Sequence, residues 1–225
     1  MVSSMICVSL AEPSVAACRA LLEGLAFAEI RMDTMQLTPN DVPGLFSGNR
    51  RLIATCRPGK RSDEERKRLL MTAITSGAAF VDVEIESGTA YREEIVAEAR
   101  SHGCRVIVSH HDYERTPERP ALEACVSACF EAGADIAKIA CMVRSDRENA
   151  RLLALLDTDR KIVVVGMGEK GKLTRMLAPL LGSPFTYASL SEGKETADGQ
   201  IDKETLQELL RTVTEVKGKR VKGKG

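Results

Sequence analysis

The sequence contains no tryptophan, and aromatic residues make up only 4% of its 225 residues. Single-stranded nucleic acids are usually bound by stacking their bases on aromatic side chains, so we expect no nucleic-acid partner. The 32 basic and 32 acidic side chains give a formal net charge of zero, which offers no overall attraction to a polyanion. No apolar run approaches the roughly 20 residues that cross a bilayer, so we also expect no membrane partner.

Histidine is scarce as well, because the chain has only three. Two of them, His110 and His111, are adjacent. Metal-dependent barrel hydrolases typically use ligand sets that are rich in histidine. We therefore expect neither a metal ion nor another cofactor.

The seven cysteines are odd in number and scattered, several of them in apolar segments. Cys125 and Cys129 lie four residues apart but have no partner pair or nearby histidine, so we expect a packing role rather than a zinc site. The first apolar run, residues 5–10, is too short for a secretory signal and no basic stretch precedes it. We therefore expect a cytoplasmic protein with reduced thiols.

Short apolar runs alternate with longer amphipathic ones along the chain. Most short runs are β-branched and almost continuously hydrophobic, as in strands that are covered on both faces. We predict strands at residues 5–10, 26–32, 52–56, 80–85, 105–109, 136–140, 161–166 and 184–188. We predict helices at 13–24, 63–76, 90–102, 119–132, 145–156, 169–181 and 203–216, and only a short element in 36–50. Ser62 and Glu65 match the capping box that begins a helix.

Eight strands that alternate with helices indicate a parallel sheet, and eight is the number that closes a TIM (β/α)8 barrel. The competing fold, a doubly wound open sheet, usually has a glycine-rich loop after an early strand. Residues 9–13 (Ser-Leu-Ala-Glu-Pro) contain no glycine. We predict a single-domain α/β TIM barrel over residues 1–216. The basic, glycine-rich residues 217–225 would form a solvated tail, the alternative being a role at a nucleic acid or a membrane surface.

Lys138 lies within the predicted strand 136–140, where a lysine is unusual. Lysine is rarely buried without a partner, and removal from water disfavours the charged form of an amine. A neutral amine in an apolar pocket attacks carbonyls and forms Schiff bases. The alternative is a lysine whose stem packs on apolar neighbours while its head stays in solvent.

Other polar residues also fall at the predicted strand ends, where TIM barrels carry their chemistry. Alternation places Glu29, Arg31 and Asp33 on one face of the second strand. It places Asp82 and Glu84 together on the fourth. Such groups either bind a ligand or form a purely structural ion-pair network. A glycine-rich run at 166–171 follows the seventh strand, and the polar loop 191–200 after the eighth is long enough to be a lid.

These residues resemble the type I 3-dehydroquinate dehydratases, which form Schiff bases. The resemblance runs from Ile6 to about Leu210 and rests on seven motifs in the same order at barrel-compatible spacing. The motifs are Glu29-x-Arg31-x-Asp33, Asp82-x-Glu84, Ser109-x-His111-Asp112, 133–140 (Gly-Ala-Asp-Ile-Ala-Lys-Ile-Ala), Met167-Gly168 with Thr174-Arg175, Gly182-Ser183, and Thr196-Ala197-x-Gly199-Gln200.

The resemblance implies a hydro-lyase that converts 3-dehydroquinate to 3-dehydroshikimate by syn elimination, the third step of the shikimate pathway to chorismate and aromatic amino acids. Lys138 would form an imine with the C3 ketone, and His111 would be the general acid–base. Glu84 would orient His111, and Arg175 would bind the substrate carboxylate. The other substrate-binding residues implied are Ser9, Glu29, Arg31, Arg57, Thr196 and Gln200. Members of this family are often homodimers.

Positive charge is expected around the reactive amine. Arg31, Arg57 and Arg175 would favour the neutral form of a neighbouring amine and would attract a carboxylate substrate. This expectation follows from charge alone and agrees with the roles that the resemblance implies.

Two alternatives stay open. A class I aldolase also places a lysine on the sixth strand, but many bind phosphate in glycine-rich loops after strands seven and eight. Here strand eight leads to 191–195 (Ser-Glu-Gly-Lys-Glu), which counts against a phosphosugar. A non-catalytic barrel that binds a small acid or a protein would need no reactive amine.

Two positions depart from the family pattern. His110 occupies a position where tyrosine or asparagine is common, and Asp198 replaces a proline in the lid motif. Proline fixes its own backbone and restricts the residue before it, so aspartate should loosen the lid and add negative charge near an anionic substrate.

We predict that Asp198→Pro lowers the KM for 3-dehydroquinate, because the lid becomes stiffer and loses a negative charge. Steady-state kinetics on the two proteins would measure it. An unchanged or raised KM would contradict this account of the lid.

Overall fold

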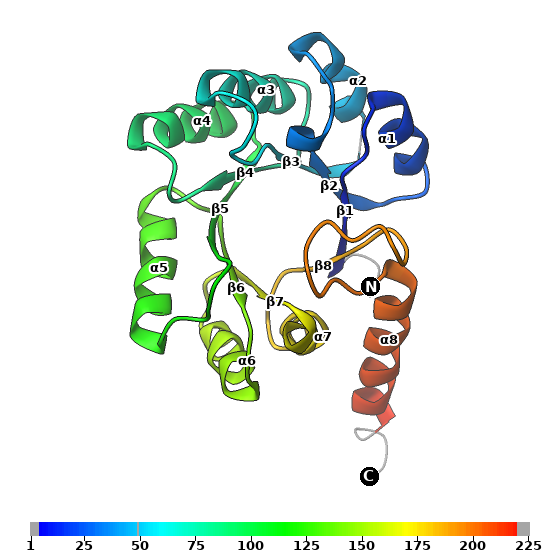
Figure 1. The fold of residues 1–225 in the computed structure, drawn as a ribbon, viewed down its shortest axis with the longest axis vertical. Helices are drawn as coiled ribbons and strands as arrows, with labels where there is room; N and C mark the ends of the chain where they lie inside the picture. The colour runs from blue at the N-terminus through cyan, green and yellow to red at the C-terminus, as the bar shows by residue number, and fades with distance from the viewer. Residues whose placement is uncertain (1–4, 49, 220–225) are drawn as a thin grey trace.

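The computed structural model describes residues 5–48 and 50–219; residues 220–225, which belong to the predicted tail, lie outside the described residues. Eight parallel strands form a nearly closed barrel that helices surround, so the predicted single-domain TIM barrel is confirmed (Figure 1). The strands are β1 (Ile6–Leu10), β2 (Phe27–Arg31), β3 (Arg51–Thr55), β4 (Phe80–Glu84), β5 (Arg105–Asp112), β6 (Ile136–Met142), β7 (Ile162–Met167) and β8 (Thr186–Ala188). They pair in chain order from β1 to β7, and β8 pairs with β1.

The helices follow the predicted order. They are α1 (Val15–Leu22), α2 (Pro43–Phe46), α3 (Asp63–Thr75), α4 (Thr89–Ser101), α5 (Arg119–Glu131), α6 (Asp146–Leu153), α7 (Lys172–Leu177) and α8 (Lys203–Lys219). Short 3-10 turns are η2 (Met32–Thr34), η3 (Pro39–Asp41), η4 (Ala154–Leu156), η5 (Glu169–Gly171) and η6 (Ala178–Leu180). The predicted capping box of α3 is present, since Ser62 and Glu65 each accept a hydrogen bond from the other's backbone amide.

Several boundaries differ from the prediction. β5 continues to Asp112 because His111 and Asp112 still pair with Ala140 and Cys141 of β6. The single helix predicted over 169–181 is broken into η5, α7 and η6, and the last piece contains Pro179, which has no amide hydrogen to donate. α8 runs to Lys219, so residues 217–219 belong to a helix rather than to the predicted tail.

The interior of the barrel is layered. Alternation along the strands turns one apolar side chain of each inward near the amino-terminal end, including Phe27, Ile53, Phe80 and Ile136. Phe27 packs against Phe80 and Phe185 with ring centroids 5.8 and 5.0 Å apart. This apolar plug closes the barrel beneath the polar residues that follow on the same strands.

Glycines let α7 pack directly against the end of β7. A Cβ atom on Gly171 would lie only 2.3 Å from the carbonyl carbon of Gly166. Thr174 of α7 accepts a hydrogen bond from the Gly166 amide at 2.7 Å, and its hydroxyl donates to the Gly171 carbonyl at 2.8 Å. This contact fixes the position of Arg175, which is the next residue of α7.

We predict that Gly171→Ala lowers the free energy of unfolding by about 1–3 kcal/mol or more, because backbone atoms must move to admit the new methyl group. Urea unfolding would measure the change. Gly24→Ala is the matched control, since a Cβ there meets nothing within 4 Å. Equal effects of the two substitutions would contradict the proposed close packing.

Candidate active site

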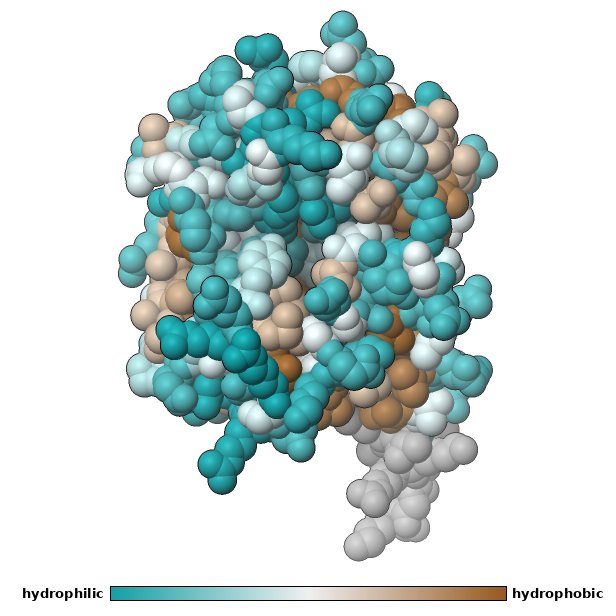
Figure 2. All heavy atoms as spheres, in the orientation of Figure 1, coloured by the Kyte–Doolittle hydropathy of each residue, from teal (hydrophilic) through white to brown (hydrophobic). Residues whose placement is uncertain are grey.

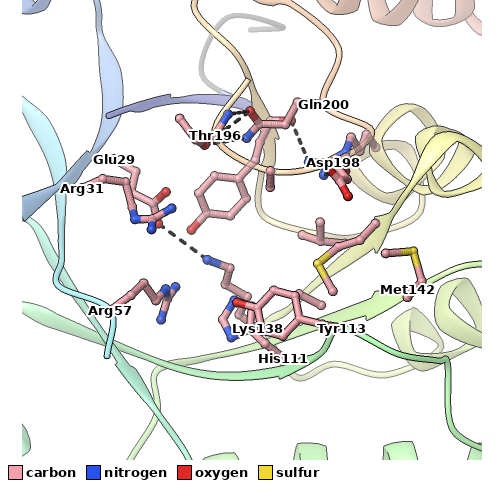
Figure 3. A pocket seen from close by; sticks show the side chains of 16 residues that line it. Glu29, Arg31, Arg57, His111, Tyr113, Lys138, Met142, Thr196, Asp198 and Gln200 are labelled. Atoms are coloured by element: carbon pink, nitrogen blue, oxygen red, sulfur yellow. Dashed lines mark hydrogen bonds and ion pairs between the residues drawn. The ribbon is translucent and has the colours of Figure 1, made fainter. Parts of the chain in front are cut away.

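A cavity of about 300 Å³ lies at the carboxyl-terminal ends of the strands (Figure 3). It is lined by eight of the residues predicted for the site: Glu29, Arg31, Arg57, His111, Lys138, Arg175, Thr196 and Gln200. The other two predicted residues, Ser9 and Glu84, do not line it. Tyr113, Met142, Met167, Tyr187 and Asp198 also line it. The structure therefore gathers side chains from distant parts of the chain around one opening.

Lys138 projects from β6 into this cavity, and the residue is only 5% exposed. Its Nζ atom donates a hydrogen bond to Asp82 Oδ2 at 3.0 Å and lies 3.6 Å from Glu29 Oε1. It also lies 4.3 Å from the centre of the Tyr187 ring. The three expected arginines line the same cavity, but the charges in direct contact with the amine are two carboxylates, because a buried amine needs anionic partners.

Asp82 of β4 is the centre of the network, and its side chain is fully buried. It accepts hydrogen bonds from Arg57, from Ser109 Oγ at 2.6 Å and from Lys138. Burial alone would raise the pKa of Asp82, but the charges of Arg57 and Lys138 outweigh it and hold the pKa well below its usual range. Sequence reasoning gave Asp82 no role, although it lies on the same face of the strand as Glu84.

Glu29 of β2 is the second carboxylate beside the amine. It accepts hydrogen bonds from Ser9 Oγ at 2.6 Å and from Thr55 Oγ1 at 3.0 Å. Burial would raise the pKa of Glu29, but Lys138 and Arg57 lower it below the usual range. Ser9 therefore positions a carboxylate of the cavity wall and does not reach the cavity itself.

Glu84 and His111 both line a second cavity, but the hydrogen-bond partners of Glu84 are other residues than the His111 that it was expected to orient. Its two carboxylate oxygens accept hydrogen bonds from Arg57 and from Arg66, the latter at 2.8 Å. Within residues 5–48 and 50–219, no hydrogen bond joins Glu84 to His111. The carboxylate whose charge acts on His111 is that of Asp82.

His111 lies near the end of β5 and faces the cavity. Burial, followed by the charges of Arg57 and Lys138, lowers the pKa of His111 well below the ordinary value of 6.5. The imidazole is therefore neutral near pH 7 and can accept a proton. His110 does not line the cavity; it contacts Glu86, which raises the pKa of His110. Strand alternation thus separates the two adjacent histidines.

Arg175 differs from the other arginines of the cavity because it has no carboxylate partner. Arg31 pairs with Asp33, which lies in η2 rather than on β2, through two hydrogen bonds of 3.0 and 2.7 Å. Arg57 pairs with Asp82 and Glu84.

Arg175 is 1% exposed and donates only to the backbone carbonyls of Tyr187 and Asp198, both at 3.4 Å. Its buried Nε atom has no hydrogen-bond partner, and burial lowers the pKa of Arg175 to about 10. Among the residues that the structure describes, no carboxylate forms an ion pair with it. The cavity therefore presents an uncompensated cation, which suits an anionic ligand.

The loop after β8 borders the cavity. Thr196 and Gln200 hydrogen-bond to each other, with the Thr196 amide 2.7 Å from Gln200 Oε1. The Gly168 amide donates to the Asp198 carbonyl at 3.2 Å. Gly199 has a φ of +74°, and a Cβ atom there would lie 2.1 Å from the Gly168 carbonyl oxygen. The loop is therefore anchored to the end of β7 beside Arg175.

No group of three or more His, Cys, Asp or Glu side chains within residues 5–48 and 50–219 is arranged to hold a metal ion. The helices of this described part are all too short or too polar to cross a membrane.

The fold and the site together define a TIM-barrel enzyme with a buried lysine in its cavity. The family model described as type I 3-dehydroquinase matches residues 6–217, and the chain belongs to this family. A 3-dehydroquinate dehydratase of Dehalococcoides mccartyi is 35% identical over 199 residues, which cover 85% of this chain and 87% of that protein. One of Methanococcus maripaludis is 42% identical over 160 residues, covering 68% and 70% of the two chains.

Solved structures agree in fold. The 3-dehydroquinate dehydratase of Geobacillus kaustophilus aligns with a TM-score of 0.84 at 23% identity, covering 94% of this chain and 91% of that one. Deoxyribose phosphate aldolase from Aeropyrum pernix has a TM-score of 0.61 at 19% identity, covering 96% and 92%. The family match, which the sequence alone left beside the aldolase and binding-protein alternatives, decides in favour of a dehydratase-type lyase.

We predict that Asp82→Asn lowers the free energy of unfolding at pH 7 by about 3–5 kcal/mol, because it removes the carboxylate that Arg57 and Lys138 share and leaves their buried charges only partly compensated. The folded pKa of Asp82 is depressed, so its stabilisation is complete above the unfolded pKa of about 3.9 and declines as the pH falls below it. The difference between wild type and variant should therefore shrink below about pH 4. Urea unfolding across pH, with the exposed Asp159→Asn as control, would measure it; a difference that grows with acidity would contradict the network.

Proposed function

We propose that this protein is a 3-dehydroquinate dehydratase that converts 3-dehydroquinate to 3-dehydroshikimate through an imine on Lys138. The observation that carries the proposal is the buried Lys138 amine in a cavity that also holds the unpaired Arg175. The names of the curated relatives support the substrate. The substrate has the matching groups, because it carries a carboxylate and a ketone.

Binding would begin with charge. The Arg175 guanidinium would receive the substrate carboxylate, which replaces the weak backbone contacts that it now makes. Arg31, Arg57 and Glu29 would contact the hydroxyl groups. Thr196 and Gln200 would cover the bound molecule from the loop after β8.

Imine formation requires an amine that has lost its proton, and neutral His111 is the base available in the cavity. The Lys138 nitrogen adds to the C3 carbonyl, and His111 returns the proton to the carbinolamine hydroxyl, which leaves as water. This step gives a cationic imine and restores neutral His111. This cation takes the place of the ammonium beside Asp82 and Glu29, so the two carboxylates are already positioned to stabilise it.

Elimination follows from the imine. His111 accepts the proton from C2, and the electron pair of that C–H bond moves toward the imine, which is the electron sink. The C1 hydroxyl leaves as water when it receives the proton from His111, so the elimination is syn. Water then hydrolyses the imine, releases 3-dehydroshikimate and restores the amine.

The proposed reaction would be the third step of the shikimate pathway, which leads to chorismate and the aromatic amino acids, in the cytoplasm.

We propose a homodimer. Apolar side chains that remain exposed on and beside α7 and on α8, namely Leu173, Leu181, Leu209 and Val213, support an interface there. Figure 2 shows hydrophilic side chains over much of the visible face and apolar ones in several places, including its lower part.

Turnover tests the proposal directly. Purified wild-type protein should convert 3-dehydroquinate to 3-dehydroshikimate, whose conjugated enone is followed by ultraviolet absorbance. Lys138→Met should lose this activity because no imine can form. Lys172→Met is the control, since Lys172 pairs only with Glu169 on the surface. Wild-type protein that is folded but leaves 3-dehydroquinate unchanged would overturn the proposal.

We predict that Arg175→Gln lowers kcat/KM by about 10- to 100-fold, mainly through KM, because a hydrogen bond to a charged group contributes about 1.5–3 kcal/mol. Arg68→Gln is the control, since that side chain of α3 is 62% exposed. Steady-state kinetics on both variants would measure it. An unchanged KM in the Arg175 variant would show that the carboxylate binds elsewhere.

A further inference from the structure

Tyr113 follows β5 and is 65% exposed, which makes it the most exposed of the large apolar side chains among the described residues. Its ring nevertheless has a specific contact. It stacks on the imidazole of His111, with ring centroids 5.9 Å apart and planes inclined by 14° (Figure 3). An exposed aromatic ring that lies almost parallel to a half-buried imidazole is placed to act on that imidazole.

The stacked pair borders two cavities. One is the site cavity of about 300 Å³, and the other, of about 460 Å³, is also lined by Glu84, Glu86 and Ser87. Arg57, His111 and Tyr113 line both cavities. Because His111 borders a polar cavity that is open to solvent, one of its faces needs a cover if the imidazole is to stay out of water.

Hydrogen bonds do not hold the imidazole ring of His111 in place among the described residues. Within the part of the chain that the structure describes, no hydrogen bond reaches either ring nitrogen of His111. The nitrogens are thus left for substrate, and the ring contact that the structure records for the imidazole is the stacking with Tyr113.

We propose that Tyr113 is a positioning residue that acts through His111: its ring holds the imidazole plane in the site cavity and shields one face from the second cavity. The proposal rests on the proposed function, in which His111 carries the protons. The aromatic ring is what matters, because the hydroxyl group takes no part in the stacking.

The charges around His111 come from several elements. Arg57 after β3 and Lys138 of β6 disfavour the imidazolium, Asp82 of β4 favours it, and His110 on the same strand opposes it. Burial is the largest influence and also disfavours the imidazolium. Removing the Tyr113 ring leaves these charged groups in place and admits water, so the pKa of His111 should rise toward its ordinary value of 6.5.

Kinetics on Tyr113→Phe and Tyr113→Ala test the proposal. Tyr113→Phe should keep kcat and the pH profile, because it keeps the ring. Tyr113→Ala should lose about tenfold in kcat through misplacement of the base. Its acid limb should move to higher pH, because the reaction needs neutral His111. An equal loss in both variants, or a loss confined to KM, would overturn the proposal.

Histidine titration by nuclear magnetic resonance tests the same inference without any turnover. The chain has three histidines, and His102→Gln and His110→Gln assign their signals. The His111 signal should titrate at higher pH in Tyr113→Ala than in wild type or Tyr113→Phe. An unchanged titration would overturn the positioning role. If wild type failed to convert 3-dehydroquinate, the proposed function would fail while this measurement still reported on Tyr113.

Discussion

The structure of the site depends on one buried ion network, in which Asp82 holds Arg57 and Lys138 together inside the barrel. Taking charged groups out of water costs several kcal/mol for each ion, and only well-placed partners offset that cost. Ser109 and Glu29 complete the set of partners. The apolar plug of Phe27, Phe80 and Phe185 closes the barrel below it, so the charges interact in a medium of low polarity.

The same network suits the proposed chemistry at the substrate carbonyl. The two carboxylates that compensate the Lys138 amine also suit a cationic imine at that nitrogen, so little must move when one cation replaces the other. Burial is the largest influence that lowers the pKa of His111, and the positive charges of Arg57 and Lys138 lower it further, so they help to keep the imidazole neutral. Arg175 lies outside the network, and in the proposed function the substrate carboxylate would be its partner. The charge of Arg175, which would bind the substrate, is thus kept apart from that of Lys138, which would react with it.

Much of this was predictable from the sequence, because β-branched runs, a lysine within one of them and polar residues at strand ends are local signals. The barrel, its eight strands and the gathering of Glu29, Arg57, His111 and Lys138 follow from such signals. Which of the two carboxylates on β4, Asp82 or Glu84, contacts the Lys138 amine does not follow from the sequence. The pairing register places Glu84 beside Ser109 and Ser109 beside Lys138, which suggests that Glu84 is level with the amine. Strands tilt in a barrel, so side chains at one height come from shifted positions, and Asp82 reaches the amine instead. The length of β5 and the breaks around α7 likewise depend on tertiary pairing and glycine contacts that no local pattern contains.

The central claim is that Lys138 forms a covalent imine, and reductive trapping tests it most directly. The protein would be incubated with 3-dehydroquinate and sodium borohydride, and the intact mass of wild type compared with that of Lys138→Ala. The account predicts one stable adduct per chain on wild type only, located in the peptide that contains Lys138. Folded wild-type protein without an adduct, or an adduct that persists in Lys138→Ala, would contradict the account.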